Sequence, residues 1–297
     1  MPNDLRPAAG RLVTRFRRQR PLRGGSLIVT IFGDSILPRG GVIALRSLIN
    51  LARPFGLNER LVRTAAARLV HDGWLEARRA GKMSEYRLSS GGRARFAEAT
   101  LRIYAGPDAA WSGRWTLVVL PAAGGVARQG LREELRWRGF GEIAAGVFAH
   151  PQPQSAGLPP QALVFGAKLS AEDQNEWLVR RGWDLAALGK RYERFVARFE
   201  DCRNALKGRG RIDPEAAYVV RTLLIHEYRR LHLRDPLLPR GLLPDAWPGA
   251  RAALLCRAIY RRVFAPSEAY LSTVAARLDG PMPPVDGSVM ERFGGLR

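Results

Sequence analysis

The segment at residues 58–71, NERLVRTAAARLVH, limits the possible fold more than any other part of this sequence. Arranged as a helix, it places apolar residues at the i, i+3, i+4 spacing that predicts one face packed on a core. The residues of that face are Leu61, Val62, Ala65, Ala66 and Leu69. The opposite face gathers Arg60, Arg63, Thr64, Ala67 and His71, with Arg68 at its edge. The segment therefore predicts a helix that packs on one side and offers arginines to a partner on the other.

This predicted helix suits DNA recognition. Asn58 can cap its first turn, and arginine offers a planar donor fork that matches guanine edges and phosphates. The alternative is an ordinary amphipathic helix whose charged face is solvated. The preceding sequence favours recognition, because 26–37 and 42–55 have the pattern of two core helices. Pro54, Phe55 and Gly56 then supply the short turn of a helix-turn-helix.

A basic hairpin follows the predicted recognition helix. Gly73 ends the helix, and two strands are expected at 74–77 and 84–88, on either side of a basic tip. Three helices and such a hairpin predict a winged helix-turn-helix domain at 25–100, with the third helix in the major groove. The side chains expected to contact DNA are Arg60, Arg63, Thr64 and Arg68 on the helix, and Arg78, Arg79 and Lys82 on the wing.

The overall charge agrees with a polyanionic partner. A net charge of +21 and an isoelectric point near 11.3 favour nucleic acid first and an anionic membrane surface second. No window offers the roughly 18–20 apolar residues of a membrane span, so we expect no membrane partner. Cys202 and Cys256 lie far apart, without a CxxC motif or a nearby pair of histidines. This spacing argues against zinc and against disulfides, and it favours the cytoplasm.

The rest of the chain predicts an α+β protein. Residues 1–24 are rich in arginine and proline and are expected to form a disordered basic arm. Strands expected at 115–120, 143–149, 162–169 and 183–185, with helices at 126–138 and 171–181, give the β-α-β-β-α-β order of a ferredoxin-like domain. A long helix at 185–206 completes this middle domain, at 114–206. A helical domain is expected at 212–280, and a mobile tail at 281–297.

Several long motifs, in this order, resemble the PaaX-type family of transcriptional repressors, which control phenylacetate degradation. The motifs are SLIVTIFGD at 26–34, GLNERLVRTAAARLVHDGWL at 56–75, RWTLVVLP at 114–121, LREELRWRGFG at 131–141, WDL at 183–185 and HEYRRLHLRDPLLPRGLLPDAWPG at 226–249. The resemblance covers most of the chain and is more specific than one helix-turn-helix. It implies a winged helix, a ferredoxin-like middle domain and a helical carboxyl-terminal domain. It also implies a homodimer that leaves its operator when it binds an acyl-CoA effector, typically phenylacetyl-CoA.

We expect such an effector to bind within 226–249. Arginines there can meet phosphates, and aromatic faces can hold an acyl or adenine group. The candidates are His226, Tyr228, Arg229, Arg230, Arg234 and Trp247. Three of these residues also have a structural alternative to ligand binding. His226 could be a buried core histidine, Arg234 could belong to an ion-paired turn, and Trp247 could anchor the packing of the loop.

Enzymatic chemistry is not expected, since the sequence has no P-loop, no dinucleotide fingerprint and no GxSxG elbow. The predicted middle domain resembles the ferredoxin fold of the CRISPR-associated spacer-integration nuclease, whose first strand ends in a metal-holding acid. Here that strand ends in Leu120, Pro121 and Ala122, so no carboxylate is available. The two remaining hypotheses are a ligand-switched repressor and a ligand-independent RNA-binding or architectural module. The second requires exposed stacking aromatics on its sheet.

Overall fold

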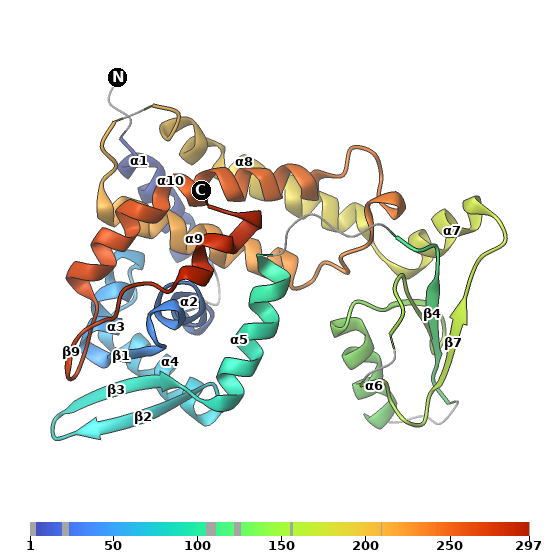
Figure 1. The fold of residues 1–297 in the computed structure, drawn as a ribbon, viewed down its shortest axis with the longest axis horizontal. Coiled ribbons are helices and arrows are strands. Elements are labelled where there is room, and N and C mark those ends of the chain that lie inside the picture. The colour runs from blue at the N-terminus through green and yellow to red at the C-terminus, as the bar shows by residue number, and fades with distance from the viewer. Residues whose placement is uncertain are drawn as a thin grey trace. The chain divides into compact units, whose positions relative to one another are not determined.

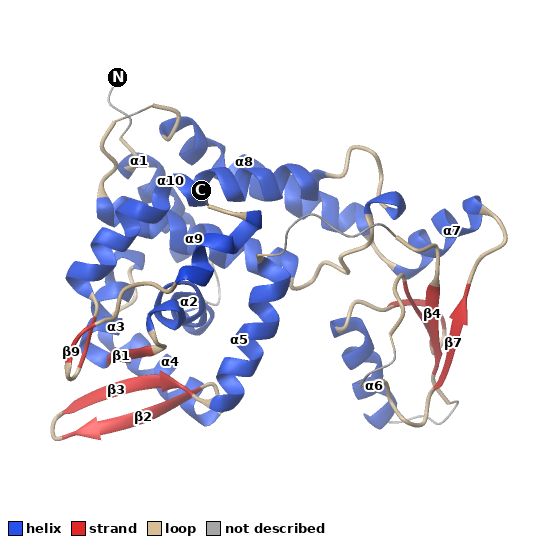
Figure 2. Cartoon of the chain, in the orientation of Figure 1, coloured by secondary structure: helices blue, strands red, loops and turns tan. Residues whose placement is uncertain are grey.

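A computed structural model describes residues 4–19, 24–104, 111–121, 126–154, 157–208 and 210–296. The described residues form helices and three small antiparallel sheets, which confirms the α+β class (Figures 1 and 2). The chain divides into two compact units. The first contains 1–106, 194–229 and 251–297, and the second contains 107–193 and 230–250. This division differs from three consecutive domains, because the carboxyl-terminal helices share a unit with the amino-terminal region.

Helix α1, Arg6–Arg17, is packed within the first unit, so the expectation of a disordered arm at 1–24 is wrong for these residues. Leu5, Leu12 and Phe16 are buried along one side of this helix. The Phe16 ring meets the His226 ring edge-on at a centroid distance of 5.7 Å. The buried residues form an apolar stripe at helical spacing. The expectation of disorder was wrong because it used the high arginine content and did not consider this spacing.

The winged helix-turn-helix occupies the next part of the first unit. Helix α2, Gly24–Ile31, continues into a π-helical turn at Phe32–Ile36 and a 3-10 turn at Leu37–Arg39. Helix α3, Leu45–Ala52, and the 3-10 turn Arg53–Phe55 lead to α4, Glu59–His71. The wing consists of β2, Leu75–Ala80, and β3, Met83–Leu88, followed by α5, Ser90–Ile103.

The helix expected at 42–55 is wrong at its start, because Val42–Ala44 forms strand β1. This strand pairs with β3 in antiparallel register, so the wing sheet has the order β1-β3-β2. Gly40 and Gly41 both have positive φ angles, 89° and 75°, which turn the chain into an extended segment. The β-branched Val42 and Ile43 favour a strand once a partner is present.

The carboxyl-terminal helices supply the remaining packing of the first unit. They are the later part of α8, Leu185–Ala205, most of α9, Pro214–His232, and most of α10, Pro248–Val274. A short hairpin follows, with β8 at Ala276–Arg277 and β9 at Gly280–Pro281. The tail expected to be mobile at 281–297 instead contains a 3-10 segment, Gly287–Gly294, that buries Val289, Arg292 and Phe293.

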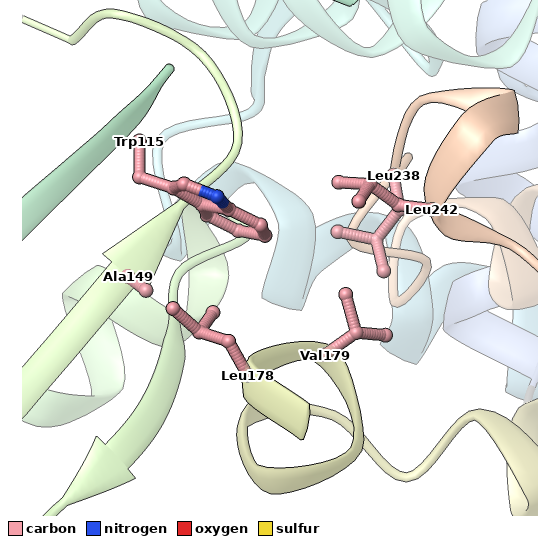
Figure 3. Packing of buried hydrophobic residues seen from close by; sticks show 6 residues of the cluster. All are labelled: Trp115, Ala149, Leu178, Val179, Leu238 and Leu242. Carbon is pink, nitrogen blue, oxygen red and sulfur yellow. The ribbon is translucent and has the colours of Figure 1, made fainter. Parts of the chain in front are cut away.

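The second unit is built on a four-stranded sheet. Its strands are β4, Trp115–Val119; β5, Gly141–Ala144; β6, Val147–His150; and β7, Leu163–Ala167. They follow the antiparallel order β5-β6-β4-β7, which is the pairing of a ferredoxin-like sheet. Helix α6, Val126–Trp137, covers the face of Val118 and Phe148. The other face, beneath Trp115, packs against α7, Glu172–Gly182, and against Leu238 and Leu242 of the 230–250 segment (Figure 3).

Two expected strands of this domain are placed differently in the structure. The single strand expected at 143–149 is interrupted by a turn at Gly146, whose φ of 80° suits glycine, and the chain reverses there from β5 into β6. The strand expected at 183–185 is wrong, because Asp184 caps α8 by accepting a hydrogen bond from the Ala187 backbone N–H at 2.9 Å. The second helix, α7, therefore follows the last strand of the sheet instead of preceding it.

None of the helices in the described residues is both long enough and apolar enough to span a bilayer.

Candidate nucleic-acid interface

Helix α4 presents its predicted reading face to solvent. Asn58 Oδ1 accepts a hydrogen bond from the Leu61 backbone N–H at 2.9 Å, which fixes the start of the helix as the sequence predicts. The four predicted contact residues of the helix are all exposed: Arg60, Arg63, Thr64 and Arg68. Val62, Ala66 and Leu69 are buried on the opposite face. Leu61, expected in the core, is 43% exposed and lies beside the reading face, so the buried stripe is narrower than predicted.

An acidic residue orients the central arginine of this face. Arg63 donates from both Nε, at 2.8 Å, and Nη2, at 2.7 Å, to the same oxygen of Glu59. The two residues are four positions apart on the helix, where side chains meet. Both are more than half exposed, so the pair adds little to stability. In the structure this contact turns the guanidinium toward the first turn of α4.

The wing is basic at its tip and anchored at its base. Arg79 and Lys82 are exposed on either side of the turn at Gly81. Arg78 is also exposed, but its guanidinium lies 3.0 Å from Glu85, whose side chain is only 8% exposed. The other oxygen of Glu85 accepts a hydrogen bond from the Leu278 backbone N–H at 3.0 Å. Glu85 therefore ties the wing to the carboxyl-terminal segment.

The sequence analysis did not name Glu59 or Glu85 as partners of the arginines in this interface. The i, i+4 spacing of Glu59 and Arg63 is visible in the sequence and could have identified the first one. Glu85 gave no comparable signal, because its partner Leu278 lies 193 positions further along the chain.

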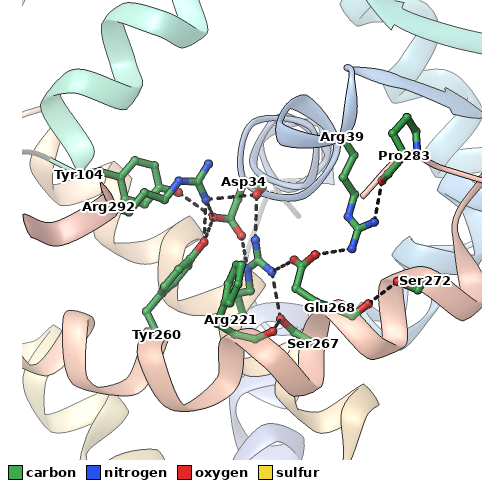
Figure 4. A network of polar contacts seen from close by, with 11 residues as sticks. Asp34, Arg39, Tyr104, Arg221, Tyr260, Ser267, Glu268, Ser272, Pro283 and Arg292 are labelled. Atoms are coloured by element: carbon green, nitrogen blue, oxygen red, sulfur yellow. Dashed lines mark hydrogen bonds and ion pairs between the residues drawn. The ribbon is translucent and has the colours of Figure 1, made fainter. Parts of the chain in front are cut away.

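A buried polar network lies behind the winged helix in the first unit (Figure 4). Asp34, in the π-helical turn, accepts hydrogen bonds from Arg221 Nε and Arg292 Nη1, both at 2.7 Å. The hydroxyl groups of Tyr104, at 2.8 Å, and Tyr260, at 2.9 Å, also donate to it. These residues come from the π-helical turn, the position directly after α5, α9, α10 and the final 3-10 segment. The network therefore joins the winged helix to the carboxyl-terminal helices.

The charges of this network control its protonation. Burial alone would raise the pKa of the Asp34 carboxyl group, but the adjacent Arg221 and Arg292 guanidinium groups and the two tyrosine hydroxyls lower it below its ordinary value. Burial raises the pKa of Tyr104 well above its ordinary value. Asp34 is therefore ionised and the tyrosine is a neutral donor at physiological pH.

The six predicted effector residues are divided between the two units. In the first, His226 and Tyr228 are buried, and Arg229 donates hydrogen bonds to the side chain of Thr30 and to Ser26. His226 Nδ1 lies 3.1 Å from the same Thr30 hydroxyl. These contacts give the three residues packing roles in the interior.

The other three effector candidates, Arg230, Arg234 and Trp247, belong to the second unit. Trp247 is only 9% exposed and packs edge-on against Tyr192 at a centroid distance of 5.9 Å. Arg234 is exposed. None of the six lines the large cavity of the second unit, although 241–245 of the same segment does, so an effector site at these six side chains stays a prediction.

In the described part of the chain, no three His, Cys, Asp or Glu side chains lie close enough together to hold a metal ion. The sheet also gives little support to RNA stacking. Trp115 is 1% exposed, and Phe165 on β7 is the exposed aromatic residue of the described strands in this unit.

Comparison with known proteins agrees with this geometry. Models of the PaaX-like protein, the PaaX protein central Cas2-like domain and the PaaX-like protein C-terminal domain match 23–92, 108–160 and 183–273. The transcriptional repressor PaaX of Escherichia coli (strain K12) is 35% identical over 289 residues, which cover 93% of this chain and 92% of that protein. The chain belongs to the PaaX-like family.

A solved structure also matches this PaaX-like chain. It is the uncharacterized protein Rv0674 from Mycobacterium tuberculosis, which is 26% identical, with a TM-score of 0.50 over 74% of this chain and 89% of that chain. The family assignment confirms the three-part α+β architecture, with a Cas2-like, ferredoxin-like central domain and a helical carboxyl-terminal part.

Proposed function

We propose that this protein is a transcriptional repressor that binds operator DNA through α4 and the β2–β3 wing. The observation that carries the proposal is the exposed arginine face of a capped helix that follows a helix-turn-helix turn and precedes a basic wing. Such a helix reads base edges in the major groove, while the wing contacts the backbone. The repressor relative, which is not an enzyme, supports the same conclusion.

The finer part of the proposal concerns regulation. The protein acts in the cytoplasm as a homodimer on an operon for phenylacetate-type aromatic catabolism, and an acyl-CoA effector such as phenylacetyl-CoA releases it from the operator. Family membership supports this part of the proposal. About two thirds of the chain lies beyond the winged helix, which is more than DNA binding alone requires.

The residues proposed to contact DNA divide by role. Arg60, Arg63, Thr64 and Arg68 face the major groove, and Arg78, Arg79 and Lys82 hold the backbone. Arg63 is the strongest candidate for base reading, because it lies at the centre of the exposed face and its contact with Glu59 favours one orientation of its guanidinium. A fixed guanidinium loses less side-chain freedom on binding a guanine edge.

Arg63→Ala tests this role directly. The variant should lose about 1–3 kcal/mol of binding free energy on the promoter next to the gene, and much less on random DNA of equal length. Gel shifts on both DNAs measure the difference. The control is Arg203→Ala, which removes another exposed arginine that is ion-paired along its own helix. Equal losses on both DNAs would reduce Arg63 to a phosphate contact, and unchanged binding on both would refute the role of α4.

Glu59→Gln provides a second measurement that separates positioning from charge. Removing the carboxylate raises the positive charge of α4, so affinity for random DNA should increase slightly. Discrimination between operator and random DNA should fall, because Arg63 is no longer held in one orientation. A variant with undiminished discrimination would show that Glu59 does not position Arg63.

A further inference from the structure

A large cavity lies entirely within the second unit, and none of its lining residues is among those proposed to contact DNA. Its volume is about 1110 Å³, and its walls come from α7, the first turn of α8 and the segment 241–245. Val179 and Leu242, which belong to the hydrophobic cluster under Trp115, form part of its floor and point toward one another (Figure 3). This volume slightly exceeds the roughly 300–1,000 Å³ of typical small-molecule sites.

Two indole rings give the cavity fixed, flat apolar walls. Trp111 donates its ring N–H to the Pro151 carbonyl at 2.7 Å, and Trp183 donates its ring N–H to the Gly139 carbonyl at 3.1 Å. Both rings also pack against Trp115, at centroid distances of 5.4 and 6.2 Å. Because these contacts hold the rings in place, little ordering entropy is lost when a planar group packs on them.

The charged side chains that line the cavity differ in whether they already have a hydrogen-bond or ion-pair partner. Asp184 caps α8 through the Ala187 N–H, and Glu176 pairs with Arg180 one helical turn away at 2.8 Å. The remaining carboxylate, Asp245, is exposed at the end of the 241–245 segment.

Arg181 is the cavity's available cation. It donates from Nε to the Ile143 carbonyl at 3.1 Å, which anchors the base of its guanidinium. Within the described residues, its two terminal nitrogens have no hydrogen-bond or carboxylate partner. An anchored guanidinium with available donors is suited to an anionic group.

We propose that this cavity is the effector site of the protein, and that its ligand is a planar aromatic group carrying an anionic substituent. The aromatic group packs between Trp111, Trp183 and the leucines of the 241–245 segment, and the anion meets Arg181. A free aromatic acid and an aromatic acyl thioester of coenzyme A share this chemistry. The inference rests on the proposed function for the idea of an effector. It moves the site from the six side chains predicted from sequence to a cavity that includes 241–245 of the same segment.

The position of the cavity in the chain explains how a ligand there can affect DNA binding. Helix α8 begins in the cavity wall at Leu185 and Ala186, and it continues without a break into residues of the first unit from 194 onward. The 241–245 wall lies between α9 and α10, which both contribute to the first unit as well. A ligand with different affinity for two arrangements of these walls shifts the population of DNA-competent protein. Typical couplings of this kind change affinity by about 5–150-fold.

Ala186→Trp tests the site by filling it. Ala186 is exposed on the cavity wall, so a larger side chain occupies the cavity and does not need to displace the core. The matched control is Ala197→Trp, which places the same side chain at another exposed alanine of α8, outside the cavity. Calorimetric titrations of the full chain use phenylacetyl-CoA, coenzyme A and phenylacetate as separate probes. Circular dichroism establishes that each variant is folded, and operator binding is measured separately.

The expected result is that Ala186→Trp weakens binding of the recognised probe about tenfold or more, because the filled cavity clashes with it. Ala197→Trp should bind as wild type. Arg181→Ala should lose affinity for the same probe, whereas Arg191→Ala, on an exposed arginine outside the cavity, should not. Binding of phenylacetate alone would identify the free acid as ligand, and binding of the thioester alone would identify the acyl-CoA. Either outcome, with the loss confined to the cavity variants, supports the site.

Other outcomes separate this inference from the proposed function. Wild-type affinity for the probe in a folded Ala186→Trp variant overturns the cavity site and leaves the repressor proposal standing. Operator binding by a wild-type protein that takes up none of the three probes overturns both the site and the effector. Loss of probe binding in Ala186→Trp alone, by a protein with no operator affinity, supports the site and refutes the repressor proposal.

Discussion

Replacing Asp34 with asparagine should destabilise the first unit by about 3–5 kcal/mol, the usual effect of removing one partner from a buried ion pair. The Asp34 side chain is 1% exposed and accepts four hydrogen bonds, two of them from guanidinium groups. Asparagine has nearly the same shape, so the variant removes the charge without creating a cavity. The effect therefore reports electrostatics and hydrogen bonding, not packing.

The magnitude follows from the charges that remain. Around Asp34 the network contains three arginines, Arg39, Arg221 and Arg292, and one other carboxylate, Glu268. Wild type therefore has three positive charges against two negative charges, and Asp34→Asn leaves three against one. Arg221 retains its ion pair with Glu268. Among the described residues, Arg292 contacts no carboxylate other than that of Asp34. A buried, uncompensated guanidinium accounts for most of the expected loss.

The pH dependence gives a second, independent signature. The folded-state pKa of Asp34 lies below its ordinary value of 3.8, so the folded protein holds this carboxylate ionised more strongly than the unfolded chain does. The stabilisation is therefore present above pH 3.8 and is lost as the pH falls through the folded-state pKa. The difference between wild type and Asp34→Asn should be constant between about pH 5 and 7 and should shrink in more acidic buffer.

Urea unfolding followed by circular dichroism measures these differences. The control is Asp201→Asn, which removes one partner of an exposed pair with Arg11 whose side chains are 62% and 61% exposed. That variant should change stability by less than about 1 kcal/mol. If Asp34→Asn is destabilised no more than Asp201→Asn, or by the same amount at every pH, the network does not stabilise the fold in the way argued above.

Two further predictions concern the wing and the interior of the first unit. Changing Arg78, Arg79 and Lys82 together to serine should weaken binding to all DNA sequences and reduce the salt dependence by about one unit per lost phosphate contact; an unchanged slope in salt titrations would show that the wing tip does not contact DNA. Arg229→Met should lower stability by about 1–3 kcal/mol, because the buried Thr30 hydroxyl loses a donor. Calorimetry on the folded variant should give wild-type phenylacetyl-CoA affinity. Weaker ligand binding there would return the effector site to the side chains predicted around Arg229.

The parts of the fold that sequence predicted well depend on local signals. The cap at Asn58, the exposed arginines of α4 and the basic turn at Gly81 are all set by residues within one or two helical turns or strand positions. Leu61 shows the limit of this reasoning. Helical spacing alone placed it in the core, but the neighbouring elements cover a narrower stripe and leave it 43% exposed.

Errors in the sequence reading arose where a distant partner decides the conformation. Val42–Ala44 is a strand because β3 offers it a hydrogen-bonding edge, and α1 is ordered because later helices cover its apolar side. The segment 230–250 joins the second unit because Leu238 and Leu242 pack beneath Trp115, more than a hundred positions earlier. No local pattern in the sequence specifies these pairings. Compositional bias, such as the arginines of α1, can also suggest the opposite outcome.

The candidate sites differ in predictability for the same reason. The reading face of α4 is a property of one helix, whereas the Asp34 network and the second-unit cavity are assembled from segments far apart in the chain. Arg221 lies 187 positions from Asp34, and Arg292 lies 258 positions from it. The sequence could not predict that these two arginines pair with Asp34, because a single arginine in a basic chain has no distinguishing pattern.

The contacts of the first unit also determine what part of the chain can act as the DNA-binding module. The winged helix at 25–100 has the motifs for recognition, but its interior depends on later residues. Arg221 and Arg292 neutralise Asp34, and the Leu278 backbone satisfies Glu85 at the base of the wing. Removing the segments that supply them would leave a buried carboxylate without its cations. The region proposed to read DNA therefore takes its stability from residues of the carboxyl-terminal helices and the final 3-10 segment. A ligand that acts on α8, α9 or α10 thus acts on helices that are part of the same folded unit as α4.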